Sequence, residues 1–264
     1  MFAKFKHTKV TLLPFFYFYI MGIRTDLQIN CDLGEGVAQE ESIYPYIDCA
    51  SIACGGHTGD LQSIEESLHY CDRYKVKAGA HPSYPDRENF GRKSLKIPFS
   101  QLEESLLDQV KLFEKSIRKF QLNIDHIKFH GALYNDAAKD SILANQLCDF
   151  ISKYYPKISL FLPPHSELEK AALARGLLIR REVFGDRRYQ ADYRLTSRTY
   201  SGALLSDLKE VEEQIDLLIS TSTLRTDIGT DLPIQAETLC FHGDNPGIHS
   251  FLPIIRAKYW SKNP

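Results

Sequence analysis

The sequence predicts a single α/β domain with parallel strands, arranged either as an open sheet or as a closed barrel. Short β-prone runs alternate with longer helical patterns along the chain, and parallel strands require long crossovers of this kind. The chain has 264 residues, of which 43% are hydrophobic, so it can bury one large core. No glycine- or serine-rich linker, low-complexity tract or internal repeat divides it.

Seven β-prone runs are the candidate strands. They are residues 26–31, 50–54, 76–80, 126–129, 159–162, 178–184 and 238–241. In the first run Asn30 and Asp32 alternate with apolar residues, and Lys128 and His130 do so in the fourth. Because side chains alternate between the faces of a strand, the polar set is expected to face a barrel interior or a cleft. There Lys128 is either a structural partner of Asp32 or a cation for an anionic group of a substrate, and the sequence favours neither.

Helical periodicity is clearest between the third and fourth strands, where apolar residues recur every three or four positions. This stripe consists of Leu102, Leu106, Val110, Phe113, Ile117 and Phe120. Ser100 and Glu103 have the spacing of a capping box, which predicts that the helix begins at Ser100. Similar patterns predict helices over residues 61–74, 141–154, 166–175 and 208–220.

The first residues form a distinct segment. Lysines precede an apolar run at residues 10–20, which superficially matches a secretory signal. However, Pro14 interrupts the run, no cleavage site follows, and the run is too short to span a bilayer. We therefore expect residues 1–22 to be an extension outside the fold, with Met21 as an alternative start and residues 23–264 as the domain. A signal or membrane-surface segment is the alternative.

Charge and cysteine content narrow the class of protein. Lys and Arg total 32 and Asp and Glu total 34, for a formal net charge of −2 without a long basic run, so neither a nucleic-acid nor a membrane partner is expected. Six cysteines are scattered without a C-x-x-C pair, and several lie in apolar runs. A reducing cytoplasm is the expected compartment.

Ionisable residues follow most of the predicted strands. The segments after the strands are residues 32–36, 54–60, 81–86, 130–135, 163–165, 182–186 and 242–245. In parallel α/β folds the carboxyl ends of all strands lie on one face, so these segments should converge. The sequence therefore predicts a shared pocket of carboxylates and imidazoles.

The sequence leaves the chemistry of this pocket open. His126 and His130 would lie about 13 Å apart on a strand and cannot share a metal there. Pairs from different strands, such as His57 with His130 or His242 with Asp32, remain possible ligands. No H-E-x-x-H, G-x-S-x-G or phosphate-binding loop is present, so no metal is assigned and no nucleophile is indicated.

The motifs resemble the LamB/YcsF family from about residue 26 to the C-terminus. The matching blocks occur in the family's order: NCDLGEG at 30–36, IACG at 52–55 with His57, GAHPSYPD at 79–86, FGR at 90–92, Lys128 with HGALYN at 130–135, EVF and DR at 182–187, and HGD at 242–244. The resemblance implies a single-domain, seven-stranded β/α barrel of the glycoside hydrolase and deacetylase type.

The resemblance also implies a reaction, ATP-dependent hydrolysis of 5-oxo-L-proline to L-glutamate with release of ADP and phosphate. It implies ATP with Mg²⁺ as its counterion, and a complex with 5-oxoprolinase subunits B and C. The residues it suggests as catalytic are His57, His81, His130, His242, Asp32 and Asp244. Those it suggests as substrate-binding are Lys128, Arg92, Asn30, Glu182, Asp186 and Tyr134.

Within that set, the roles are hypotheses from chemistry. His130 or His81 would be the general base and His242 the acid toward the ring nitrogen. Asp32 and Asp244 would orient the imidazoles, while Lys128 and Arg92 would hold anionic groups. His126 and His165 fit no family block and are expected to be structural.

The sequence departs from the family pattern at Gln28, Ser51, Gly56, Phe129 and Gly185, where the resemblance leads one to expect aspartate, asparagine, phenylalanine, proline and alanine. Two alternatives to the 5-oxoprolinase hypothesis therefore stay open. One is a stand-alone metal-dependent deacetylase or amidase, and the other is a protein that binds a small lactam or carbamoyl compound for a partner enzyme.

Overall fold

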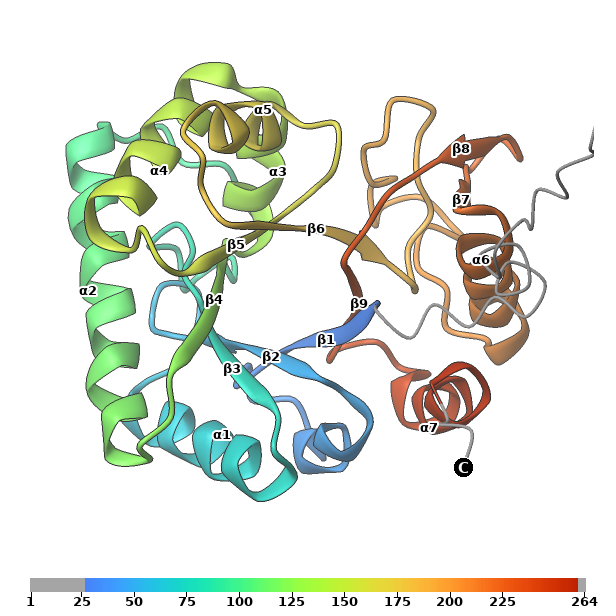
Figure 1. The fold of residues 1–264 in the computed structure, drawn as a ribbon, viewed down its shortest axis with the longest axis horizontal. Helices are drawn as coiled ribbons and strands as arrows, with labels where there is room; N and C mark the ends of the chain where they lie inside the picture. The colour runs from blue at the N-terminus through green and yellow to red at the C-terminus, as the bar shows by residue number, and fades with distance from the viewer. Residues whose placement is uncertain (1–26, 261–264) are drawn as a thin grey trace, which may run out of the picture.

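Seven parallel strands close into a barrel in the order β1-β2-β3-β4-β5-β6-β9 in the computed structural model, which describes residues 27–260 (Figure 1). The strands are β1 (Gln28–Leu33), β2 (Cys49–Ala53), β3 (Lys77–His81), β4 (Ile124–Lys128), β5 (Ser159–Leu162), β6 (Ile179–Phe184) and β9 (Thr238–His242). All seven predicted strands are confirmed, and the closed order decides between sheet and barrel. The predicted extension at residues 1–22 lies outside the described residues.

Helices cover the outside of the barrel (Figure 1). They are α1 (Leu61–Tyr74), α2 (Phe99–Lys119), α3 (Gly131–Lys139), α4 (Ser141–Tyr154), α5 (Glu167–Ala174), α6 (Leu208–Thr221) and α7 (Ile248–Tyr259). The short helices η3 (Glu40–Ser42) and η4 (Tyr44–Tyr46) follow β1, and β7 (Thr223–Arg225) and β8 (Asp231–Pro233) form a separate antiparallel pair.

The predicted start of α2 is wrong. The helix begins at Phe99, its N-cap residue is Pro98, and no side chain caps it. Ser100 therefore lies inside the first turn, and the backbone N–H of Leu102 donates to the carbonyl of Pro98 instead. A capping box with the predicted reciprocal geometry occurs at α1, where Asp60 accepts from the backbone of Ser63 and the Ser63 hydroxyl accepts from the backbone of Asp60.

Helices α3 and α7 and the β7–β8 pair were not predicted. Helix α3 follows β4 with only two residues between Lys128 and Gly131, so its residues read as part of the strand-end loop. Helix α7 contains Pro253, which obscures its periodicity. Among residues 27–260, no helix combines the length and apolar character that a membrane span requires.

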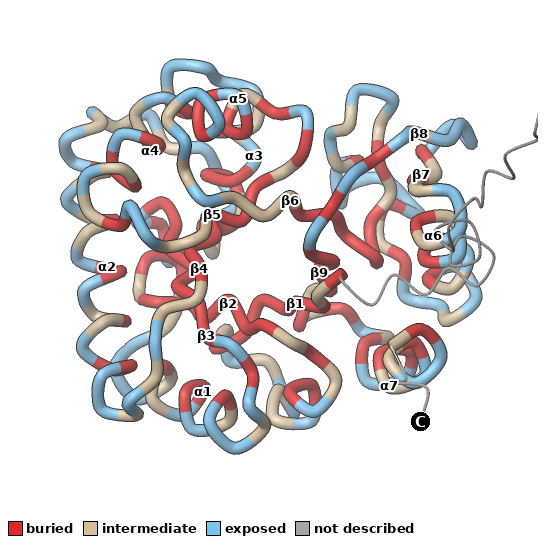
Figure 2. Tube along the Cα trace, viewed as in Figure 1, coloured by how far each residue is buried: buried red, intermediate tan, exposed pale blue. Residues whose placement is uncertain are grey.

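The core lies between the strands and the helices, while the barrel interior is polar. The outward-facing residues of β1, Ile29, Cys31 and Leu33, are fully buried. Figure 2 shows that most of strand β1 is buried. Asn30 and Asp32 face inward, and both are also buried, as the alternation predicted. All six cysteines are buried free thiols. Polar side chains packed inside a barrel must pair with one another, and this requirement shapes the site.

Candidate functional site

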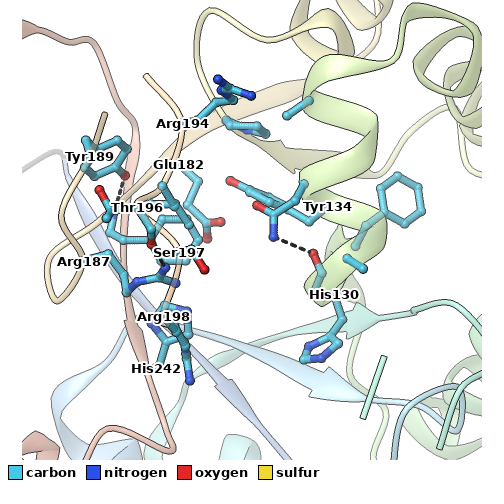
Figure 3. A pocket seen from close by; sticks show the side chains of 18 of the residues that line it. His130, Tyr134, Glu182, Arg187, Tyr189, Arg194, Thr196, Ser197, Arg198 and His242 are labelled. Carbon is cyan, nitrogen blue, oxygen red and sulfur yellow. Dashed lines mark hydrogen bonds between the residues drawn. The ribbon is translucent and has the colours of Figure 1, made fainter. Parts of the chain in front are cut away.

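A cavity of about 750 Å³ opens at the carboxyl ends of the strands. Figure 3 shows its two walls, with His130 and Tyr134 on one side and Arg187, Arg198 and His242 facing them. The predicted site residues that line it are Asp32, His81, Arg92, Lys128, His130, Tyr134, Glu182, His242 and Asp244. The strand ends therefore converge as the sequence predicted.

Lys128 lies at the floor of the cavity between two carboxylates. Its Nζ is 2.7 Å from Oδ1 of Asp32 and 2.9 Å from Oε1 of Glu182, and its side chain is only 2% exposed. Burial alone would lower the pKa of Lys128, but the charges of Asp32 and Glu182 raise it well above its usual value. Lys128 is thus a structural partner of Asp32, which is the first of the two sequence-based alternatives. It also lines the cavity, and its role as a cation for a substrate group stays a prediction.

His81 and His130 form a buried pair beside this floor. Nδ1 of His130 is 3.0 Å from Nε2 of His81. The other nitrogens face backbone carbonyls, Nδ1 of His81 at 2.8 Å from Lys128 O and Nε2 of His130 at 3.0 Å from Phe90 O. The two outer nitrogens are therefore engaged by carbonyls, while Nδ1 of His130 and Nε2 of His81 face each other. Which of the two imidazoles is the general base stays a prediction.

Glu35 joins the imidazole pair to His57. Its Oε1 lies 3.0 Å from Nε2 of His57 and 3.3 Å from Nδ1 of His130. The rings of His57 and His130 stack in parallel with centroids 3.6 Å apart. Burial, with the nearby charge of His81, lowers the pKa of His57 to about 2, and burial raises the pKa of Glu35. One oxygen of Glu35 and one nitrogen each of His81 and His130 lie within 4.8 Å of one another, close enough to share a metal ion.

His242 is held from behind by Asp186. Its Nδ1 is 2.9 Å from Oδ1 of Asp186, and its backbone N–H donates to Oδ2 at 3.0 Å. Burial alone would raise the pKa of Asp186, but the charge of His242 and hydrogen bonds from His242 and Asn245 lower it. Since Nδ1 donates to the carboxylate, Nε2 is the acceptor of a neutral ring, and it makes no hydrogen bond to any residue in the described range 27–260. Nε2 of His242 is therefore available to the cavity, which His242 lines.

Asp244 does not orient an imidazole, contrary to the prediction. Its carboxylate instead accepts from Arg92 at 2.7 Å and from Arg198 at 2.8 Å. Burial would raise the pKa of Asp244, but the hydrogen bond and charge of Arg198 lower it to about 2. The carboxylate that orients His242 is Asp186, and the one beside His57 and His130 is Glu35.

Three of the predicted residues lie behind the cavity wall. Asn30 donates to Oγ1 of Thr238 at 2.7 Å inside the barrel, His57 lies behind His130, and Asp186 lies behind His242. Sequence reasoning missed Glu35 and Arg198 as site residues. Glu35 belongs to the 30–36 motif and follows β1 directly, so its position at a strand end was a usable signal. Arg198 lies in an irregular segment with no such signal.

A second hydrogen-bonded chain lies deeper in the barrel. Oγ of Ser51 is 3.0 Å from Nε2 of His126, whose Nδ1 is 3.1 Å from Asp125. This is the order of a catalytic triad, but Ser51 and His126 are fully buried and Asp125 is also paired with Arg180 at 2.6 Å. The chain is therefore structural, as expected for His126.

The departures at residues 28 and 56 are accommodated locally. Gln28 accepts a hydrogen bond from Arg180 at 3.1 Å. At Gly56 an added Cβ would meet Oε1 of Gln109 at 2.3 Å, and Gln109 in turn bonds the backbone of Ser83. The space beside Gly56 is thus filled by Gln109.

Comparisons with known proteins identify relatives along nearly the whole chain. The LamB/YcsF family profile matches residues 27–263. A protein from Symbiobacterium thermophilum, named as the A subunit of 5-oxoprolinase, is 35% identical over 244 residues, which cover 90% of this chain and 94% of that protein. A protein of the same name from Chloroflexus aggregans is 35% identical over 226 residues, covering 84% and 90%.

Solved structures share the fold. A structure described as a lactam utilization protein from Thermus thermophilus superimposes with a TM-score of 0.81 at 26% identity, covering 88% of this chain and 95% of that one. A structure described as a putative cellobiose-phosphate cleavage protein from Enterococcus faecalis has a TM-score of 0.55 at 14% identity, covering 89% and 91%, and is similar in fold alone.

Proposed function

The chain belongs to the LamB/YcsF family, and from this premise we propose that it is the A subunit of an ATP-dependent 5-oxoprolinase. In this proposal it opens 5-oxo-L-proline to L-glutamate, ATP is consumed to ADP and phosphate, and subunits B and C complete the enzyme. The observation that carries the proposal is the cavity at the strand ends, because it combines a proton-transfer group with cations around a polar floor.

Opening a lactam needs activation of a stable amide. Phosphorylation of the carbonyl oxygen by ATP makes the ring carbon a better target for water, and the ring nitrogen then leaves with a proton. His242 suits the proton transfer, since Asp186 fixes its tautomer and Nε2 is available to the cavity. We assign His242 the role of general acid toward the ring nitrogen: Nε2 takes the proton that the attacking water loses and then delivers it to the departing ring nitrogen.

Cationic side chains on the His242 wall suit anionic groups. Arg187, Arg194 and Arg198 line this part of the cavity, and Arg92 approaches it through Asp244. The substrate carboxylate and the phosphoryl group both carry negative charge, which guanidinium groups bind well. Lys128 is already shared by two carboxylates. Arg92 and Arg198 share the single carboxylate of Asp244, and Arg194 pairs with Asp192. Each guanidinium has five N–H groups and keeps some for a further anion, so these arginines are better placed than Lys128 to bind one.

The test is glutamate release from 5-oxoproline by the full chain, with and without ATP and with and without subunits B and C. Release that requires both ATP and the partner subunits is the expected result. Release without ATP would instead favour a stand-alone amidase. Saturable binding of 5-oxoproline without glutamate release would favour a binding protein. The control for this outcome is that the same B and C subunits release glutamate when combined with the A subunit of another species.

A further inference from the structure

The hydrogen bonds around His81 and His130 leave no proton for the two ring nitrogens that face each other. A neutral imidazole carries one N–H, and a backbone carbonyl only accepts. The proton of His81 is required at Nδ1, opposite Lys128 O, and the proton of His130 is required at Nε2, opposite Phe90 O. The facing nitrogens, 3.0 Å apart, therefore both present lone pairs.

Two carboxylate oxygens approach these facing nitrogens, one from each side chain of Glu35 and Asp32. Oε1 of Glu35 is 3.3 Å from Nδ1 of His130, and Oδ2 of Asp32 is 3.5 Å from Nε2 of His81. Oδ1 of Asp32 is already bound to Lys128, which leaves Oδ2 for this cluster. Three electron-rich atoms, from Glu35, His81 and His130, thus lie within 4.8 Å of one another, and Oδ2 of Asp32 lies next to His81. All four residues line the cavity.

We infer that Glu35, His81 and His130 form a binding site for one divalent transition-metal ion, with the Asp32 carboxylate next to His81. Bonds of about 2.1 Å in tetrahedral geometry separate neighbouring ligand atoms by about 3.4 Å, and the observed separations are 3.0 Å between the two imidazole nitrogens and 3.3 Å between Glu35 and His130. Metal-binding histidines donate their other N–H to a carbonyl or carboxylate, as both imidazoles do here. Two imidazole nitrogens favour Zn²⁺, Mn²⁺, Fe²⁺ or Co²⁺ over Mg²⁺ and Ca²⁺.

A shared proton is the competing occupant. It would join the two facing nitrogens but leave Oε1 of Glu35 without a bond to Nδ1 of His130 at 3.3 Å, whereas a metal ion engages all three atoms at once. Since the ligands line the cavity, a bound ion would have an open position toward it, suited to a water molecule or a carbonyl oxygen.

The test measures binding and needs no turnover, so it is independent of the proposed substrate. The full chain is stripped with a chelator and titrated with Zn²⁺ against a chromophoric competitor, and bound metal is counted after gel filtration. We expect a single equivalent in the wild type and at least a ~100-fold lower affinity in Glu35→Gln and His130→Ala. His165→Ala, a histidine of the same cavity outside the cluster, is the matched control and should bind Zn²⁺ like the wild type.

Two further readouts keep the inference falsifiable. Co²⁺ should give a visible ligand-field spectrum in the wild type and in His165→Ala but not in Glu35→Gln. Glutamine has nearly the same shape as glutamate, so Glu35→Gln keeps the test valid if His130→Ala fails to fold. Equal Zn²⁺ affinity in the wild type and in a folded Glu35→Gln would overturn the inference. So would long-range ¹H–¹⁵N spectra showing a proton between His81 and His130 in the presence of excess Zn²⁺.

Discussion

Replacing Lys128 by methionine should destabilise the fold strongly. The ammonium group lies close to the Asp32 and Glu182 carboxylates, at 2.7 and 2.9 Å, and those side chains are 10% and 0% exposed. Methionine fills most of the volume but leaves two like charges together in the barrel. Removing one partner of a buried ion pair costs about 3–5 kcal/mol, and we expect Lys128→Met to fall in this range at neutral pH.

Urea unfolding measures this loss. Trp260 is the only tryptophan, and its Nε1 donates to the carbonyl of Leu27 at 2.6 Å, so its fluorescence reports the packing of α7 against the barrel. The matched control is Lys153→Met, because Lys153 is 61% exposed and pairs with Glu103 at the surface. That variant should lose less than about 1 kcal/mol.

The loss should depend on pH with a defined sign. In the wild type burial raises the pKa of Asp32, but His81 and Lys128 lower it well below its usual value. Without Lys128 this pKa rises, so the folded variant binds protons more readily than the folded wild type, and the stability difference narrows as the pH falls from about 7 to about 5. A loss no larger than that of Lys153→Met, or a difference that widens on acidification, would refute this reasoning.

Three other substitutions test the account. Asp186→Asn replaces one of the two carboxylate oxygens that accept from His242 with an NH2 donor, so the side chain can no longer hold both the ring and the backbone N–H. The kcat of the assembled enzyme should fall by about 10²–10⁴-fold with little change in KM, and an unchanged kcat would contradict this positioning role. Gly79→Ala places a Cβ 2.3 Å from Nε2 of His126 and should cost about 3 kcal/mol, lowering Tm by about 6–12 °C in calorimetry, so a shift below about 2 °C would disagree. The pKa of Asp244 is about 2, against about 3.9 when unfolded, so its contribution of about 2 kcal/mol is present above about pH 4 and lost between about pH 4 and pH 2. In Asp244→Asn the free energy of unfolding, measured by urea titration at several pH values, should fall less steeply on acidification than in the wild type. An equally steep fall would contradict this assignment.

The sequence predicted the strands because strand patterns are local. Alternation in β1 and β4 placed Asp32 and Lys128 inside the barrel before any contact was known. The parallel α/β class and the membership of His81, His130 and His242 in one cavity followed from the alternation of strands and helices. The closed seven-stranded barrel was predicted from the family resemblance.

The partners of those residues were not predictable in the same way. Asp186 and Asp244 both lie at strand ends, and the choice between them as partner of His242 depends on how the chain turns after β6 and β9. Arg198 reaches Asp244 from an irregular segment without periodicity. The predicted capping box of α2 was wrong because Pro98 occupies the N-cap position, one residue before Phe99. Such contacts arise from tertiary packing, which no single-sequence pattern encodes.

The most direct test of the central claim measures glutamate release by the enzyme assembled from this chain and subunits B and C. The substitution is His242→Asn, with His69→Ala on the exposed face of α1 as the control. The account predicts that His242→Asn lowers glutamate release by about 10²–10⁴-fold while His69→Ala retains it. Wild-type glutamate release by His242→Asn would place the ring opening outside this cavity and contradict the account.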